Sequence, residues 1–226
     1  MHRPLSTDDL QLDAAHGSGC LTQAGLLELV VELRSTGRRR LIGLTGPPGS
    51  GKSHLAVHLA RSLNPAPPVV PMDGFHLAQA VINAKGLANR KGAPETFDAW
   101  GFVNLVDRLA GPAGDAVVMA PKFDRSIEEP IAGAIPVVPG DGLVIVEGNY
   151  LLLDESPWER IRPALDLCAY LELDDEIRMC RLIDRHVRYG RTRPEAECFV
   201  RDSDERNAQL IKTTRERADV VVRMEA

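Results

Sequence analysis

The feature that most constrains this chain is a glycine-rich segment that runs from Gly46 to Ser53. Its order, Gly-x-x-x-x-Gly-Lys-Ser, matches the Walker A pattern of phosphate-binding loops. An apolar run over residues 41–44 precedes the segment, and leucines four residues apart over 55–63 follow it. A strand, a loop and a helix in this order let backbone N–H groups and the positive end of the helix dipole meet one anion. The segment therefore predicts an α/β fold with a phosphate site between this strand and this helix.

Further apolar runs alternate with helical patterns along the chain, which predicts a mainly parallel sheet with helices on both faces. The expected strands are residues 69–72, 116–119, 143–146, 167–171 and 220–222. The expected helices are residues 21–34, 100–109, 175–189 and 194–217. Two segments rich in Gly and Pro, 74–98 and 121–141, interrupt the alternation. We expect them to be functional loops at strand ends, with floppy surface excursions as the alternative.

Composition and charge narrow the class of protein. The chain has 226 residues and a net charge of −5, which fits one globular domain and argues against a nucleic-acid or membrane-surface binder. It has no run of eighteen apolar residues and no apolar leader, so we expect no membrane span and a cytoplasmic location. The four cysteines form no Cys-x-x-Cys pair, which favours reduced thiols over a metal site.

The phosphate-binding loop suggests its own ligands. Lys52 is placed to reach the β- and γ-phosphates of a nucleotide, and the hydroxyl of Ser53 is placed to bind Mg²⁺. We therefore predict ATP and Mg²⁺ as cofactors. The rest of the predicted nucleotide site is Gly46, Gly49, Ser50, Gly51 and His54. A glycine-rich turn without a ligand is the alternative.

Two carboxylates stand where strands end. Glu147 follows the apolar run 143–146, the Walker B arrangement that delivers a carboxylate to the metal or its waters. Asp73 follows the run 69–72, where a carboxylate can accept a proton from an attacking hydroxyl. His76, three residues later, can bind a polar acceptor. Each carboxylate has an alternative interpretation as a turn residue, and Asp73 precedes Gly74, a common turn pair.

Several classes of nucleotide-binding protein are disfavoured by missing strings. The chain has neither the Asn-Lys-x-Asp of GTPases nor the Leu-Ser-Gly-Gly-Gln of transporter ATPases. What it has, in order, is the Walker A loop, Met-Asp-Gly-Phe-His (72–76), Arg-Lys-Gly-Ala-Pro-Glu-Thr-Phe-Asp (90–98) and Val-Glu-Gly-Asn-Tyr-Leu-Leu (146–152). From about residue 41 to the C-terminus the chain resembles the phosphoribulokinase/uridine kinase family of P-loop kinases. The 90–98 string resembles its nucleoside/nucleotide kinase-like, or fructokinase-like, subgroup.

The resemblance implies a fold and a division of the chain. It implies a P-loop NTPase-type three-layer sandwich with a helical lid at about residues 178–193. We accordingly assign residues 1–38 to an N-terminal helical extension and 39–226 to a P-loop kinase domain. Asp73 becomes the expected catalytic base, acting with Lys52 and Arg185.

The resemblance also points to an acceptor pocket. The string Pro121-Lys-Phe-Asp-Arg125 is similar to a Pro-x-Tyr-Asp segment of uridine kinases, but Phe123 replaces the tyrosine and removes a hydroxyl. The predicted acceptor-binding residues are His76, Arg90, Lys91, Phe123, Asp124, Glu147, Asn149 and Tyr150. A basic cluster of Lys85, Arg90 and Lys91 could hold an anionic group of the acceptor, or it could be a solvated loop.

The expected lid carries arginines at 178, 181, 185 and 188, whose spacing of three and four places them on one helix face. They could close over ATP phosphates, or they could form a solvated face balanced by nearby carboxylates. Family lids have a similar spacing followed by Gly-Arg, so Arg185 is the favoured phosphate contact and Arg191 the second.

The expected activity is ATP-dependent phosphorylation of a hydroxyl on a small metabolite, by a monomer or homodimer. A sugar or sugar acid is the first acceptor class, and a nucleoside or pantothenate-like alcohol is the alternative. A nucleotide-hydrolysing switch or metallochaperone is an alternative of another class.

Overall fold

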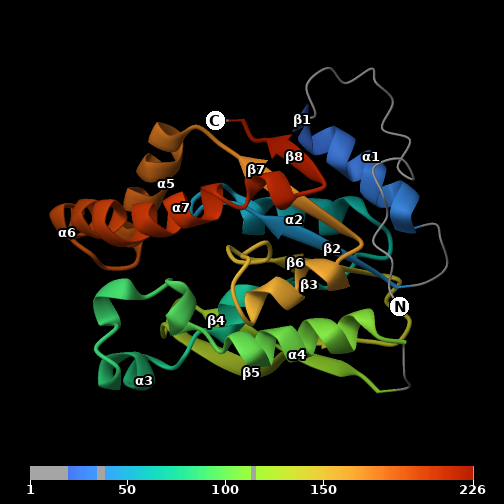
Figure 1. The fold of residues 1–226 in the computed structure, drawn as a ribbon, viewed down its shortest axis with the longest axis horizontal. Coiled ribbons are helices and arrows are strands. Elements are labelled where there is room, and N and C mark those ends of the chain that lie inside the picture. The colour runs from blue at the N-terminus through green and yellow to red at the C-terminus, as the bar shows by residue number, and fades with distance from the viewer. Residues whose placement is uncertain (1–19, 35–38, 113–115, 226) are drawn as a thin grey trace.

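The central element is a six-stranded sheet in which all strands run parallel (Figure 1). The computed structural model describes residues 20–34, 39–112 and 116–225. The spatial order of the strands is β1 (Cys20–Leu21), β8 (Val220–Arg223), β7 (Leu167–Glu172), β2 (Arg40–Thr45), β6 (Leu143–Glu147) and β3 (Val69–Pro71). The central strands β2 and β6 are buried at every residue, as strands covered on both faces must be. The predicted parallel α/β fold is confirmed.

Helices cover the two faces of this sheet. Ile42 and Leu44 of β2 share a buried cluster with α1 (Gln23–Arg34) and α2 (Lys52–Ser62). Leu41, on the opposite face of β2, belongs to a second cluster with α4 (Ala99–Ala110). Residues 20–34 of the predicted N-terminal extension thus share the sheet and the core, because β1 pairs with β8 and α1 packs on β2. Residues 1–19 and 35–38 of that extension lie outside the described residues.

One predicted strand was wrong. Residues 116–119 do not join the parallel sheet; β4 (Val118–Asp124) instead pairs antiparallel with β5 (Glu129–Val137) in a separate two-stranded sheet. The physical reason is the alternation along β4, where Val118 and Ala120 are buried while Met119 between them is exposed. A strand of this kind has one buried and one exposed face, which suits a two-stranded antiparallel sheet. Most of the expected loop 121–141 is therefore a β-hairpin.

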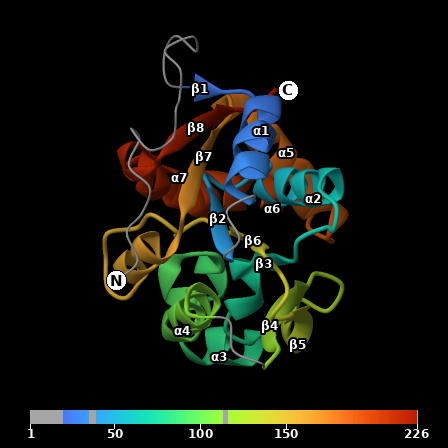
Figure 2. The same ribbon diagram turned by 90° about the vertical axis from the view of Figure 1, so that its right-hand side faces the viewer.

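The other interrupting segment, 74–98, forms short helices. A 3-10 turn over Met72–Phe75 leads into α3 (Gln79–Ala84), and further 3-10 turns occur at Ala88–Arg90 and Pro94–Thr96. Figures 1 and 2 both show α3 and α4 beside the hairpin, at the bottom of the molecule.

The expected lid is helical, and its helices lie above α3 at the left of Figure 1. The expected range, about residues 178–193, covers most of α5 (Asp175–Arg188) and the turn before α6 (Arg193–Phe199). A π-helical turn over Val200–Asp204 and α7 (Glu205–Lys212) follow, and we call the whole segment 175–212 the lid. The single helix expected over 194–217 is thus interrupted. Of the helices described, none is long and apolar enough to cross a membrane.

Candidate active site

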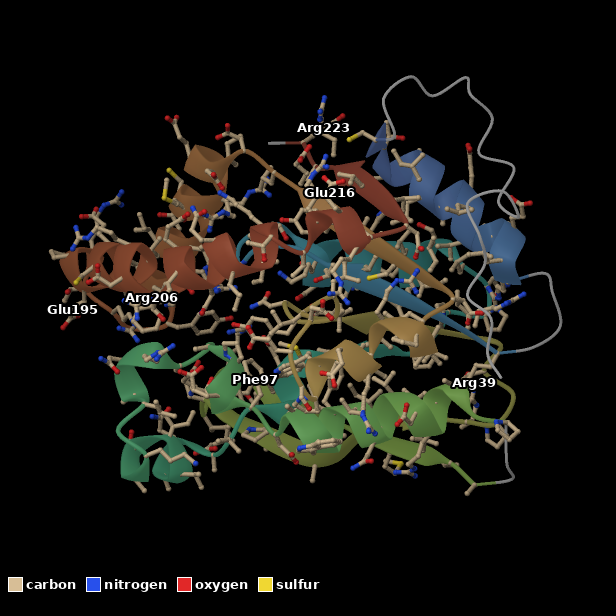
Figure 3. All side chains as sticks on the ribbon, viewed as in Figure 1. Arg39, Phe97, Glu195, Arg206, Glu216 and Arg223 are labelled. Carbon is tan, nitrogen blue, oxygen red and sulfur yellow. The ribbon has the colours of Figure 1, made fainter. Side chains whose placement is uncertain are left out.

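A cavity of about 840 Å³ lies where the phosphate-binding loop, the segment 74–98, the hairpin and the lid meet. Figure 3 shows Phe97, one of its lining residues, between the lower layer of α3 and α4 and the layer of α6 and α7. The predicted site residues that line the cavity are Gly49, Gly51, Lys52, Ser53, His54, Asp73, His76, Lys91, Phe123, Glu147, Asn149, Arg185 and Arg191. Fold topology therefore brings most of the predicted site to one place.

The loop between β2 and α2 has the backbone that a phosphate cradle needs. Gly46, Gly49 and Gly51 have positive φ values of 146°, 82° and 96°. A Cβ on Gly49 would lie 2.8 Å from the backbone oxygen of Arg178, so no larger residue fits there. The Oγ of Ser50 is buried without a hydrogen-bond partner among the described residues. Because buried polar atoms are normally paired, this orphaned hydroxyl is consistent with a ligand in the loop.

Lys52 is turned back on its own loop. Its ammonium donates to the carbonyl oxygens of Gly46 at 2.8 Å and Pro47 at 3.0 Å. Burial lowers the pKa of Lys52 to about 8, although the carboxylates of Glu147 and Asp73 oppose the shift. A phosphate would replace two neutral acceptors with a charged one, which is the stronger partner for an ammonium.

Ser53 and Glu147 form a pair of oxygen ligands. The Ser53 hydroxyl donates to Oε1 of Glu147 at 2.8 Å, and the register of β2 against β6 sets Glu147 beside Leu44 at the start of the loop. Burial, with the negative charge of Asp73, raises the pKa of Glu147 to about 7. A hydroxyl and a carboxylate are hard oxygen donors of the kind that Mg²⁺ prefers. The donor set thus fits ATP with Mg²⁺.

Asp73 lies on the 3-10 turn that directly follows β3. Its Oδ2 accepts from Nη2 of Arg125, on the hairpin turn, at 2.8 Å. Burial opposes ionisation of Asp73, but nearby positive groups, led by His76 (charged only in acid) and Arg125, hold its pKa below the usual value. Gly74 is needed beside it, because a Cβ there would lie 2.5 Å from the Pro121 carbonyl oxygen. Asp73 is therefore an ionised carboxylate fixed by the hairpin.

Aromatic rings form the wall next to Asp73. His76 stacks on Phe97 with ring centroids 4.0 Å apart, and Phe123 lies 5.1 Å from the same imidazole. Burial lowers the pKa of His76, so its ring is neutral at pH 7. Its Nδ1 is buried with no hydrogen-bond partner in the described part of the chain.

The arginines of α5 divide into two groups. Arg178 is fully buried; it donates to the Pro48 carbonyl at 3.3 Å and forms ion pairs with Asp175 and Glu205. It therefore braces the phosphate-binding loop from behind. Arg181, Arg185 and Arg188 line the cavity instead.

Burial, assisted by the positive charge of Arg125, lowers the pKa of Arg185, although the group stays charged at neutral pH. Arg191 lies over the ring of Phe199, with its guanidinium carbon 4.0 Å from the centroid. Both arginines are placed to face a ligand in the cavity.

The structure places three predicted acceptor residues away from the cavity lining. Arg90 pairs with Glu95 at 2.8 Å and lines a smaller neighbouring pocket of about 360 Å³. Asp124 accepts from the backbone and hydroxyl of Ser126 on the exposed hairpin turn. Tyr150 is buried and donates to the Gly92 carbonyl at 2.6 Å. Tyr150 thus supports the segment that carries Lys91.

Some cavity residues escaped the sequence analysis. They are Gln79, Arg125, Glu128, His186, Tyr189, Asp204 and Asn207. Arg125 stood at the end of the Pro-Lys-Phe-Asp-Arg string, the one available signal. Asp204 is buried beside His186, with Oδ2 and Nε2 2.8 Å apart, in the π-helical turn that no sequence pattern predicted.

Comparisons with known proteins identify the family of the chain. The sequence model of the phosphoribulokinase/uridine kinase family matches residues 41–225. The chain is 37% identical over 201 residues to the putative uridine kinase of Schizosaccharomyces pombe, covering 85% of this chain and 84% of that protein. It is 34% identical over 207 residues to the uncharacterised protein YggC of Escherichia coli, covering 88% and 84%.

A solved structure is similar along nearly the whole chain. It is a putative fructose transport system kinase from Silicibacter sp. TM1040, with a TM-score of 0.80, 37% identity, and coverage of 91% of this chain and 100% of that one. The fold and the phosphate-binding loop define the class, a P-loop kinase that uses ATP. Within that class, the chain belongs to the phosphoribulokinase/uridine kinase family, so the predicted resemblance is confirmed.

Proposed function

We propose that the protein transfers the γ-phosphate of ATP to a hydroxyl of a small metabolite, with a sugar or sugar acid as the first acceptor class. The observation that carries this proposal is that an ionised carboxylate, Asp73, shares one cavity with Lys52 and Arg185. Its relatives are named for different hydroxyl-bearing compounds, uridine in one case and fructose transport in another. A hydroxyl acceptor would suit both names.

The cavity residues divide the work of phosphoryl transfer. Asp73 accepts the proton of the acceptor hydroxyl as its oxygen bonds to the γ-phosphorus and the bond to the ADP oxygen breaks. Arg125 occupies Oδ2 of Asp73, which leaves Oδ1 for the hydroxyl. Lys52 leaves its loop carbonyls for the β- and γ-phosphates, and Arg185 and Arg191 neutralise charge on the transferring group. Ser53 and Glu147 would hold Mg²⁺, which supplies charge neutralisation on the phosphates.

A nucleoside is the second candidate acceptor. The grouped rings of His76, Phe97 and Phe123 can stack on a nucleobase as well as on the apolar face of a sugar. Phe123 offers no hydroxyl to bind the base. A base would therefore depend on stacking and on groups such as Asn149 and Gln79.

The test is an ADP-release screen over sugars, sugar acids, nucleosides and pantothenate-like alcohols, followed by Asp73→Asn. Asparagine keeps the size of the side chain but accepts no proton at neutral pH. Single-turnover transfer should fall about 10²- to 10⁴-fold while ATP affinity stays unchanged.

Asp124→Asn is the matched control, because Asp124 lies nearby on the hairpin but outside the cavity lining. A rate for Asp73→Asn within threefold of wild type would refute the base assignment. Steady ATP hydrolysis that no acceptor stimulates would favour a nucleotide-dependent switch instead.

A further inference from the structure

The positive side chains that line the cavity are of two electrostatic kinds. On the lid side, Arg185 and Arg188 form no ion pair with any residue that the structure describes. The guanidinium of Arg191 lies over the Phe199 ring and forms no ion pair with a described residue. The lid side also has two lining carboxylates, Asp184 and Asp204, but its arginines outnumber them. The excess of positive charge suits the polyphosphate of a nucleotide.

On the acceptor side, in contrast, the positive charges are neutralised by carboxylates. Its two cationic lining residues, Lys91 and Arg125, are each paired with a carboxylate that also lines the cavity. Lys91 lies 3.0 Å from Glu128 Oε2, and Arg125 lies 2.8 Å from Asp73 Oδ2. Two positive and two negative charges therefore cancel around the place where the acceptor must bind.

Lys91 has no donor left for an anion. Its ammonium donates to Oε1 of Gln79 at 2.9 Å, to the backbone oxygen of Glu128 at 3.1 Å and to the carboxylate of Glu128 at 3.0 Å. A lysine ammonium has three N–H donors, so all are used. The side chain that the sequence offered as an anion ligand is instead a structural tie between the segment 74–98 and the hairpin.

The hairpin turn is shaped to make this tie. Glu128 is the one non-glycine residue with a positive φ, 56°, among the described residues. A non-glycine residue adopts that conformation at a cost, which its contacts with Lys91 offset. The next residue, Glu129, accepts from the backbone N–H of Gln79 at 3.1 and 3.2 Å. The neutralisation of Lys91 is therefore built into the backbone of the turn.

Three other polar groups on this side are not ion pairs. Gln79 and Asn149 are amides, and burial lowers the pKa of His76, which favours its neutral ring. Phe97 and Phe123 supply apolar surface for the C–H faces of a sugar. Hydroxyls, which both donate and accept, match such a set better than a carboxylate or phosphate does.

We infer that the acceptor is an uncharged polyhydroxylated compound, and that the Lys91–Glu128 and Arg125–Asp73 pairs discriminate against sugar acids and sugar phosphates. This inference rests on the proposed function and removes the sugar acids from its candidate acceptors.

Matched neutral and anionic compounds test it in two assays. The pairs are D-glucitol with D-gluconate, glycerol with D-glycerate, and D-fructose with D-fructose 6-phosphate, with uridine added. ADP release measures turnover, and saturation-transfer NMR in the presence of Mg²⁺ and a non-hydrolysable ATP analogue measures binding. We expect uncharged compounds to bind, and kcat/KM at least tenfold higher for the neutral member of any active pair.

The outcomes distinguish a failure of the uncharged-acceptor inference from a failure of the proposed kinase reaction. Preferred binding or turnover of an anionic member, or binding of no compound, would overturn the inference. Binding of a neutral compound without phosphoryl transfer would sustain the inference and count against the proposed kinase reaction.

A pair of variants then tests the origin of the discrimination. Glu128→Gln frees the charge of Lys91, so the anionic-to-neutral ratio of binding affinities should rise about threefold to tenfold. Glu95→Gln frees Arg90 in the same way, but that pair lies outside the main cavity, so the ratio should not change. Equal ratios for Glu128→Gln and Glu95→Gln would overturn the role given to the Lys91–Glu128 pair.

Discussion

Lys52 and Glu147 are buried ionisable residues of opposite charge, and both are shifted toward their neutral forms. Burial brings the pKa of Lys52 down to about 8 and that of Glu147 up to about 7. A phosphate beside Lys52, or a metal ion beside Glu147, would restore the charged forms. Binding of such a ligand would therefore offset part of the desolvation cost of these two groups.

Replacement of Glu147 by Gln should reveal the desolvation cost of the carboxylate as a change in the stability of the metal-free protein. A carboxyl group whose pKa is raised by folding binds more protons in the folded than in the unfolded state between pH 4.5 and about 7. Its contribution to stability is therefore lost as the pH rises through that window. We expect Glu147→Gln, which can still accept from Ser53, to gain up to about 3 kcal/mol over wild type by pH 8, and almost nothing near pH 4.5.

Urea unfolding at several pH values in the presence of EDTA measures the difference. A gain that is the same at pH 4.5 and pH 8 would show that the carboxyl does not titrate in this window.

Replacement of Lys52 by Ala should weaken ATP binding and leave the fold intact. The ammonium reaches only loop carbonyls in the structure, and its loss removes a buried charge rather than core packing. ATP affinity should fall about 10- to 100-fold, the range expected when a charge-assisted phosphate contact is lost. Titration calorimetry with ATP and Mg²⁺ measures it. The control is Arg61→Ala, an exposed cation at the far end of α2; equal losses in both variants would contradict a specific contact.

At the residue scale, the sequence predicted what depends on local spacing. The loop residues follow from the Walker A order, and Asp73 and Glu147 follow from where apolar runs end. Arg125 and Glu128 could not be found in this way. Their roles depend on a hairpin that returns to β3 across about fifty residues, and no local pattern encodes that approach.

At the scale of elements, α5 shows what the spacing of residues can predict and what it cannot. The spacing of its arginines predicted the helix, but it also suggested that all four arginines share one role. In the structure Arg178 is buried, because its side chain lies against the phosphate-binding loop and pairs with Glu205 of α7. The pairing of β4 in a hairpin was missed for a related reason: its partner, β5, is rich in Ala, Gly and Pro and shows no alternation of polar and apolar residues.

Replacement of Arg178 by Ala should destabilise the protein. It leaves the Glu205 carboxylate without its ion-pair partner and removes a bond to the Pro48 carbonyl behind the loop. Because Glu205 is partly exposed, we expect a loss of about 2–4 kcal/mol, at or below the range for a broken buried ion pair. Arg188→Ala, on the same helix, is the matched control and should change stability by less than about 0.5 kcal/mol. Equal losses of unfolding free energy in the two variants would refute the bracing role.

For the whole molecule, the cavity has two walls that serve different ligands. The lid helices α5 to α7 form one wall, and the segment 74–98 with the hairpin forms the other. A non-hydrolysable ATP analogue with Mg²⁺ should therefore slow amide hydrogen exchange at least threefold in residues 46–53 and 175–212, and leave 118–137 unchanged. Exchange measured by mass spectrometry tests this. Protection of the hairpin rather than the lid by the nucleotide would reverse the assignment of the walls.

The tie between α3 and the hairpin has an evolutionary consequence. The backbone of Gln79 is bonded to Glu129, and Gly74 leaves no room for any side chain against Pro121. The two segments thus form one cassette, which is also tied to the loop after β6 through the bond from Tyr150 to the Gly92 carbonyl. A chimera that exchanges this cassette whole carries its bonds with it, whereas an exchange of either segment alone leaves Gln79 or Glu129 facing a foreign partner. We therefore expect changes of acceptor preference in such a fold to require paired substitutions in the two segments.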